Sequence, residues 1–324
     1  MKAKWMERPE GGSTFGLRLI RGFALLCGRT AARVLLYPIT LYYLIRRGPE
    51  RRASRDYLTR MFGRRPSWFQ IAKHFHTFAA TILDRVFLLS ERFKRFDVRH
   101  EGLDDLRNAW KQDHGVLVFG SHLGSFDALR TFAQLREDVN IRVVIDVEQN
   151  QALFSVLSVL NPALAKSIIN ARQDGAITAL AIKEALDEKA LVTVLVDRSR
   201  PDNQTVDVDF LGGTAAFPVG PWMLASALKV PVVLCFGLYR GGNRYDFYFE
   251  LFSESLVIQR GRREAAVKEI VQRYADRLAH HARMAPYNWF NFYDFWHTHA
   301  SLAPHATHTS DAGAGHDASI DPRS

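Results

Sequence analysis

From Val116 onward, short apolar runs rich in β-branched residues alternate with helical patterns. Parallel neighbouring strands need a long crossover, usually a helix, so this alternation predicts an α/β fold with a largely parallel sheet covered by helices. The last two runs are separated only by Gly241-Gly242-Asn243 and are expected to pair as a hairpin. The predicted strands are 116–119, 141–147, 167–169, 191–196, 232–239 and 245–252, and the predicted helices between them are 126–135, 151–160, 177–188 and 220–228.

Two longer helices flank this pattern. Residues 67–93 form a helix candidate with Ser67 as the N-cap, and residues 260–283 form another with an apolar stripe. No internal repeat is present. We divide the chain into a flexible N-terminus (1–12), an apolar and basic helical segment (13–66), an α/β domain (67–296) and a disordered tail (297–324).

The turn after the first of these strands, Gly120-Ser-His-Leu-Gly-Ser-Phe-Asp127, is the strongest candidate for chemistry. His122 is expected in the turn and Asp127 in the first turn of the next helix, so that their side chains can face each other. A carboxylate bonded to an imidazole sets its tautomer and stabilises the ring when it takes a proton. The pair therefore predicts a general base acting on a hydroxyl. A glycine-rich turn with one histidine also occurs for structural reasons alone, and the pair by itself leaves that alternative open.

Further candidates follow two other segments. The strand 191–196 leads directly into Asp197 and Arg198, and charges at the carboxyl end of a parallel strand often line a ligand crevice. A salt bridge that caps the sheet is the alternative. The Gly/Pro-rich stretch 210–221 is expected to be a loop that shapes a pocket before the next helix. The predicted substrate-contacting residues are Gly124, Ser125, Asp197, Arg198, Gly213 and Pro218.

The positive charge is concentrated at the N-terminus. Residues 1–66 contain fifteen Lys and Arg against four Asp and Glu, a net charge of +11, and since the whole chain carries +9, the other 258 residues carry −2. Residues 15–47 are apolar but are interrupted by arginines and by Pro38, so no run reaches the ~20 residues of a spanning helix. We predict an interfacial helix or a membrane-dipping hairpin, followed over 46–65 by a contact for anionic head groups. A helix pair packed on the protein itself is the alternative.

Seven aromatic residues lie between 285 and 296. Core packing and contact with a membrane interface or an acyl chain are both open for this segment. No metal site is expected, since His74 and His76 are two residues apart and would not share a helical face.

In this order and spacing, the motifs resemble the late acyltransferases of lipid A biosynthesis, which belong to the lysophospholipid acyltransferase superfamily. The sequence is also similar to a subgroup found alongside aryl-polyene pathways. The likeness covers residues 15–296. It rests on His122-x-x-x-x-Asp127, Val196-Asp-Arg198, Phe210-Leu-Gly-Gly with Phe217-Pro, Met223-Leu-Ala and Pro286-Tyr-Asn-Trp-Phe.

The resemblance implies a glycerolipid acyltransferase-like fold. It implies an acyl-thioester donor, carried by acyl carrier protein or coenzyme A, and a lipid or glycolipid hydroxyl as acceptor. The place of action would be the cytoplasmic face of a bacterial inner membrane, with peripheral or N-terminal attachment. His122 carries over as the general base, Asp127 as its orienting partner and Arg198 as a contact for acceptor phosphates. No cofactor, metal or nucleic acid is expected to take part.

Two other functions use the same features. A hydrolase of acyl thioesters would use the His122–Asp127 pair with water as the acceptor. A non-catalytic protein that binds membrane lipids would need only the basic and apolar N-terminus. A requirement for a lipid acceptor separates transfer from hydrolysis, and activity on any thioester excludes the third possibility.

Overall fold

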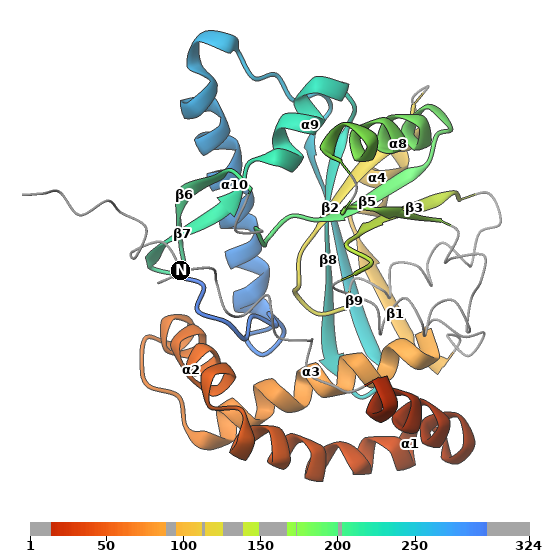
Figure 1. Ribbon diagram of the computed structural model, residues 1–324, viewed down its shortest axis with the longest axis vertical. Coiled ribbons are helices and arrows are strands. Elements are labelled where there is room, and N and C mark those ends of the chain that lie inside the picture. The colour runs from red at the N-terminus through yellow and green to blue at the C-terminus, as the bar shows by residue number, and fades with distance from the viewer. Residues whose placement is uncertain are drawn as a thin grey trace, which may run out of the picture.

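The structure is a computed structural model, and it shows a mixed α/β fold with a largely parallel sheet, as the alternation predicts (Figure 1). It describes residues 14–88, 95–111, 114–125, 139–148, 167–172, 174–199 and 203–296, with the side chains of 14–21, 23–25 and 260 left out. The predicted helices 126–135 and 151–160 lie outside the described residues. The predicted flexible N-terminus (1–12) and tail (297–324) also lie outside them.

The main sheet has seven strands in the order β1-β9-β8-β2-β5-β3-β4. Neighbours are parallel except β8 and β9, which form the predicted antiparallel hairpin across Gly241. The edge strand β1 is not predicted from the sequence, because its alternating charged residues lack an apolar run. The strands are β1 (Asp97–Glu101), β2 (Val116–Gly120), β3 (Ile141–Ile145), β4 (Ile168–Asn170), β5 (Leu191–Leu195), β8 (Val232–Gly241) and β9 (Arg244–Ser253).

Helices α8, α9 and α10 begin and end within three residues of their predicted bounds, α3 begins one residue after its predicted start, and α4 is not predicted. At the start of α3, the Ser67 hydroxyl accepts from the backbone N–H of Gln70, and the Gln70 side-chain oxygen accepts from the backbone N–H of Ser67. This reciprocal pair is a capping box. The helices are α1 (Thr14–Arg46), α2 (Gly48–Phe62), α3 (Trp68–Leu88), α4 (Leu103–Trp110), α8 (Gly175–Asp187), α9 (Gly220–Leu228) and α10 (Arg263–Met284).

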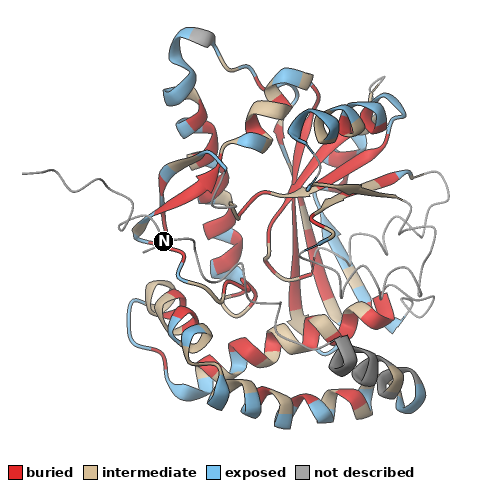
Figure 2. Ribbon diagram, in the orientation of Figure 1, coloured by how far each residue is buried: buried red, intermediate tan, exposed pale blue. Residues whose placement is uncertain are grey.

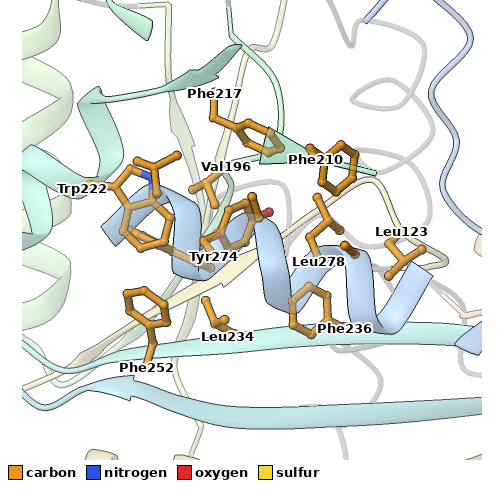
Figure 3. Packing of buried hydrophobic residues seen from close by; sticks show 14 of the residues in the cluster. Leu123, Val196, Phe210, Phe217, Trp222, Leu234, Phe236, Phe252, Tyr274 and Leu278 are labelled. Atoms are coloured by element: carbon orange, nitrogen blue, oxygen red, sulfur yellow. The ribbon is translucent and has the colours of Figure 1, made fainter. Parts of the chain in front are cut away.

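Helices cover both faces of the sheet, and the central strand β2 is buried along its whole length (Figure 2). Along β2, Leu117 and Phe119 enter the core under α8, α9 and α10, while Val116 and Val118 enter the core under α3 and α4. A strand with two buried faces requires such an uninterrupted apolar run. Figure 3 shows the first core, with side chains of β8 lying across from those of α10.

The stretch predicted as a Gly/Pro-rich loop is instead a second, two-stranded sheet. Strands β6 (Thr205–Phe210) and β7 (Gly213–Pro218) pair antiparallel through the two-residue turn Leu211-Gly212. Both turn residues have positive φ, 49° and 74°, as a tight hairpin turn requires. Leucine rarely adopts this conformation, so the sequence carries no hairpin signal here; burial of the Leu211 side chain offsets the cost.

The N-terminal helix α1 is interrupted at Gly28, which has non-helical backbone angles, whereas Pro38 lies inside its second part. Arg29 forms a two-pronged ion pair with the fully buried Asp84 of α3, with N–O distances of 2.7 and 2.8 Å. Tyr245 donates a third hydrogen bond to Asp84. These contacts hold α1 against α3 and the β8–β9 hairpin. The arginines of this part of α1 therefore face the protein and not a membrane.

The opposite side of α1 exposes apolar residues at helical spacing. This outer stripe consists of Leu26, Val34, Tyr37, Leu41 and Ile45, each more than half exposed. Among the described residues, no helix is long and apolar enough to cross a membrane.

Candidate active site

The turn at residues 121–125 follows β2, the strand at the centre of the sheet. β2 lies between β8 and β5, and the turn begins where β2 and β5 both end, whereas β8 continues beside it to Gly241. Leu123 turns into the hydrophobic core and is almost fully buried. The preceding side chain, His122, is about one third exposed, at 32%. The alternation at the turn thus leaves the imidazole partly exposed.

Asp197 lies directly behind His122. Gly120 pairs with Leu195 in the register of β2 with β5, so the residues that follow the two strands meet. The Asp197 Oδ1 atom is 2.8 Å from the His122 Nδ1 atom, and Asp197 Oδ2 accepts from the backbone N–H of His122 at 2.9 Å. One carboxylate therefore holds both the ring and the backbone of the histidine.

The Asp197 side chain is fully buried and ionised. Burial by itself would raise the pKa of Asp197, but the charge and hydrogen bonds of His122, with the charge of Arg198, outweigh it and bring the pKa down to about 2. An ionised carboxylate only accepts hydrogen bonds, so the proton between the two groups belongs to Nδ1 of His122. The ring nitrogen that can accept a proton is consequently Nε2.

The aromatic segment 285–296 closes over the turn from the other side. The N–H of Gly124 donates to the Asn288 carbonyl at 2.8 Å, and the N–H of Phe290 donates to the His122 carbonyl at 3.0 Å. Between them, Leu123 and Trp289 form an antiparallel bridge. The core-packing alternative holds for Trp289, which is fully buried, so it cannot lie in a membrane interface.

Gly124 is required for this fit. Its φ is +70°, and a Cβ atom added there would lie 1.8 Å from the carbonyl oxygen of Gly237 on β8. The sequence predicts that a substrate contacts Gly124. In the structure, the backbone of Gly237 approaches Gly124 closely. Among the described residues there is no cluster of histidine, cysteine, aspartate or glutamate that could hold a metal ion.

A family model described as bacterial lipid A biosynthesis acyltransferase matches residues 25–298. The chain belongs to this family. A comparison with curated proteins finds no match. The protein is therefore an acyltransferase, and its family acts on a lipid acceptor.

The acyltransferase structure brings together some of the predicted substrate-contacting residues and separates others. Gly124, Ser125, Asp197 and Arg198 all lie at or beside the turn that carries His122. Ser125 is buried, and its N–H donates to the Gly237 carbonyl. The Arg198 guanidinium bonds the Phe290 carbonyl and lies 5.5 Å from the centre of the Tyr293 ring.

The other two predicted contacts, Gly213 and Pro218, lie at the two ends of β7. Gly213 packs against Arg60 of α2 and the indole of Trp296, and a Cβ atom there would lie 2.4 Å from the guanidinium. In the hairpin, Gly213 pairs with Phe210 and Pro218 pairs with Thr205. Asp127 lies outside the described residues, so the predicted His122–Asp127 contact stays a prediction.

Sequence reasoning missed the role of Trp289. Its indole Nε1–H donates to Asp197 Oδ2 at 3.0 Å. The sequence marks this tryptophan as one of seven aromatics and as part of the Pro286-Tyr-Asn-Trp-Phe motif, and nothing in its spacing connects it to residue 197. The one general signal for this contact is that a buried tryptophan usually donates its indole N–H to an acceptor.

Proposed function

We propose that this acyltransferase moves an acyl chain from an acyl thioester to a hydroxyl of a lipid or glycolipid, with His122 as general base and Asp197 as its orienting carboxylate. The observation that carries the proposal is the ionised, fully buried Asp197 bonded to Nδ1 of a partly exposed histidine at the carboxyl end of the central strand. This arrangement keeps the basic nitrogen on the side of the ring away from the carboxylate.

The reaction needs no covalent enzyme intermediate. Nε2 of His122 takes the proton of the acceptor hydroxyl while its oxygen attacks the thioester carbonyl. Asp197 stabilises the imidazolium that forms. When the tetrahedral intermediate collapses, the carbon–sulfur bond breaks and the thiolate leaves with the proton from His122, which restores the neutral base.

Arg198 is our candidate for the anionic part of the acceptor. It follows the orienting carboxylate directly, and its position beside the turn suits a phosphate group next to the reacting hydroxyl. A guanidinium can bind phosphate with two parallel hydrogen bonds, which would fix the orientation of the acceptor.

The family resemblance implies that Asp127 also acts at this site. We propose for Asp127 a role that differs from that of Asp197. Asp197 already occupies Nδ1, so Asp127 would act on another part of the site, such as the donor or the acceptor. Separate Asp127→Asn and Asp197→Asn variants distinguish the two carboxylates.

We place the enzyme on the cytoplasmic face of a bacterial inner membrane, attached through α1 to α3. The outer stripe of α1 offers apolar side chains, and Trp68 and Phe69 at the start of α3 are also exposed. Arg46, Arg52 and the pair Arg64-Arg65 are exposed on the same helical unit. Apolar side chains beside arginines fit a surface of anionic lipid.

The test is acyl transfer by the purified enzyme, with the same acyl chain presented on acyl carrier protein and on coenzyme A, and with bacterial glycolipid vesicles as acceptor. We expect acylated lipid from the wild type and a loss of about 10³-fold in His122→Ala. Thioester turnover at the same rate without vesicles would instead support a hydrolase. Near wild-type transfer by His122→Ala would overturn the proposed mechanism.

A further inference from the structure

We propose that Trp289 is a positioning residue for this reaction, and that a chain of hydrogen bonds from α2 and α3 through Trp289 holds Asp197 and His122 in their reactive arrangement. The inference rests on the proposed function, since it concerns how the base is held. It assigns a task to the closing aromatic segment that neither the family nor the sequence motif supplies.

The first link is the indole of Trp289. Asp197 Oδ2 accepts from this indole and from the His122 backbone, which leaves Oδ1 directed at Nδ1 of His122. Both Trp289 and Asp197 are fully buried, so water does not replace the indole N–H as a donor. The indole therefore fixes the rotation of the carboxylate on which the imidazole rests.

The second link holds Trp289 itself. Its ring packs edge-on against Tyr57 of α2, Phe210 of β6 and Phe295, with centroids 5.0 to 5.1 Å apart. Three aromatic neighbours at nearly right angles leave the indole little room to rotate. Its N–H is thus aimed by packing and not by the hydrogen bond alone.

The third link is His74 of α3, which has no part in the mechanism. Its Nε2 is 2.9 Å from the Trp289 carbonyl, and its Nδ1 is 2.8 Å from the Ser54 hydroxyl of α2. A carbonyl only accepts, so Nε2 carries the proton, Nδ1 accepts, and Ser54 donates. Burial, only partly opposed by the bond to Trp289, lowers the pKa of His74 to about 4, so the ring is neutral near pH 7.

These links join the N-terminal helices to the base without a gap. Ser54 donates to His74, His74 donates to the Trp289 carbonyl, the Trp289 indole donates to Asp197, and Asp197 accepts the Nδ1 proton of His122. Helices α2 and α3 are the ones we place at the membrane. The geometry of the base consequently depends on how these helices are seated.

Trp289→Phe removes the indole N–H and keeps an aromatic ring. The matched control is Trp222→Phe, because Trp222 is equally buried and packs against aromatic rings, but its Nε1 has no hydrogen-bond partner among the described residues. We expect kcat to fall about tenfold in Trp289→Phe with KM changed less than twofold. Without one donor, Asp197 becomes more basic and holds the protonated imidazole more tightly, so the acidic limb of the pH–rate profile moves to higher pH.

Trp222→Phe is expected to lower the melting temperature and leave the pH–rate profile in place. A wild-type kcat and pH profile in Trp289→Phe, or the same shift in both variants, would overturn the assignment. If Trp289→Phe does not fold, an isosteric analogue at position 289 with sulfur in place of the indole N–H removes the donor and keeps the shape.

A second measurement does not depend on activity. The His122 Nδ1 proton should give a downfield proton resonance that is absent in His122→Ala and shifted in Trp289→Phe. An unchanged resonance in Trp289→Phe overturns the positioning role even if the enzyme turns out to be a hydrolase. A shifted resonance in a protein with no acyl transfer would leave the positioning role standing and remove the proposed function.

Discussion

Two aspartates of this acyltransferase are fully buried, and their partners differ. Asp84 of α3 is bonded by Arg29 and by the Tyr245 hydroxyl. Asp197 is bonded by His122 and by the Trp289 indole. Arginine is charged at every accessible pH, so the first cluster contains no base that could take a proton from a substrate near neutral pH. Histidine changes its charge near neutral pH. The second cluster therefore places a buried carboxylate beside a group that can take up and release a proton.

Asp84 holds structural elements together, whereas Asp197 supports the proposed chemistry of His122. A buried charge is costly unless it is paired, and both sites meet this requirement. At Asp84 the pairing docks α1 against α3 and the β8–β9 hairpin. At Asp197 the pairing leaves an exposed imidazole with its basic nitrogen directed outward. The four predictions that follow test this difference, from the largest expected effect to the smallest.

Asp197→Asn should have the largest effect. The amide keeps the shape of the carboxylate but cannot stabilise the imidazolium, and it favours the wrong tautomer of His122. We expect kcat for acyl transfer to fall about 10³- to 10⁴-fold, with a folded protein by circular dichroism. Retention of more than a tenth of the wild-type rate would show that Asp197 is structural, like Asp84.

Asp84→Asn should destabilise the protein and leave chemistry largely intact. The partly buried Arg29 side chain loses its charge partner, which we expect to lower the free energy of unfolding in urea by about 3 kcal/mol. The control is Asp104→Asn, since the Asp104–Arg107 pair lies on the surface and should matter by less than about 0.5 kcal/mol. A kcat loss as large as that of Asp197→Asn would erase the distinction between the two sites.

His74→Gln tests the neutral histidine that supports Trp289. An unfolded chain protonates histidine near pH 6.5, whereas burial holds the pKa of His74 at about 4 in the folded protein. The unfolded state therefore binds more protons between these values, so this contribution to stability is complete above pH 6.5 and falls as the pH drops toward 4, by up to about 3 kcal/mol.

The glutamine variant lacks this titration. Its free energy of unfolding should depend less steeply on pH over the same interval, although it is lower at pH 7. Equal slopes for the wild type and His74→Gln, measured by urea unfolding at several pH values, would show that His74 is not held neutral.

Leu41→Asp tests the outer stripe of α1, where the expected effect is the smallest. Placing a charge on this face should weaken binding to anionic vesicles about tenfold, because one apolar side chain is lost from the interface. Ile177→Asp is the matched control, since Ile177 is also exposed and apolar but lies on α8. An equal loss in the two variants, measured by vesicle flotation, would show that α1 is not the docking surface.

Local patterns predicted most of the sheet and helices. The run at β2 predicts a strand buried on both faces, and Ser67 predicts the start of α3. The β6–β7 hairpin escaped prediction because its turn places a leucine at positive φ. The sequence predicts an interfacial helix or a membrane-dipping hairpin over residues 15–47, whereas in the structure the buried Asp84, 55 residues away, binds Arg29 of this segment. Spacing along a helix shows which residues share a face and cannot show what that face meets.

The sequence by itself determined the α/β class, the family resemblance and His122 as the residue most suited to chemistry. Each of these depends on residues close together in the chain, where periodicity and turn preferences act. Only the tertiary structure decided that His122 rests on Asp197, that Asp197 rests on Trp289, and that His74 holds Trp289. These contacts join residues 75 to 215 positions apart, and they exist because β2 lies beside β5 while the closing segment folds back over their ends.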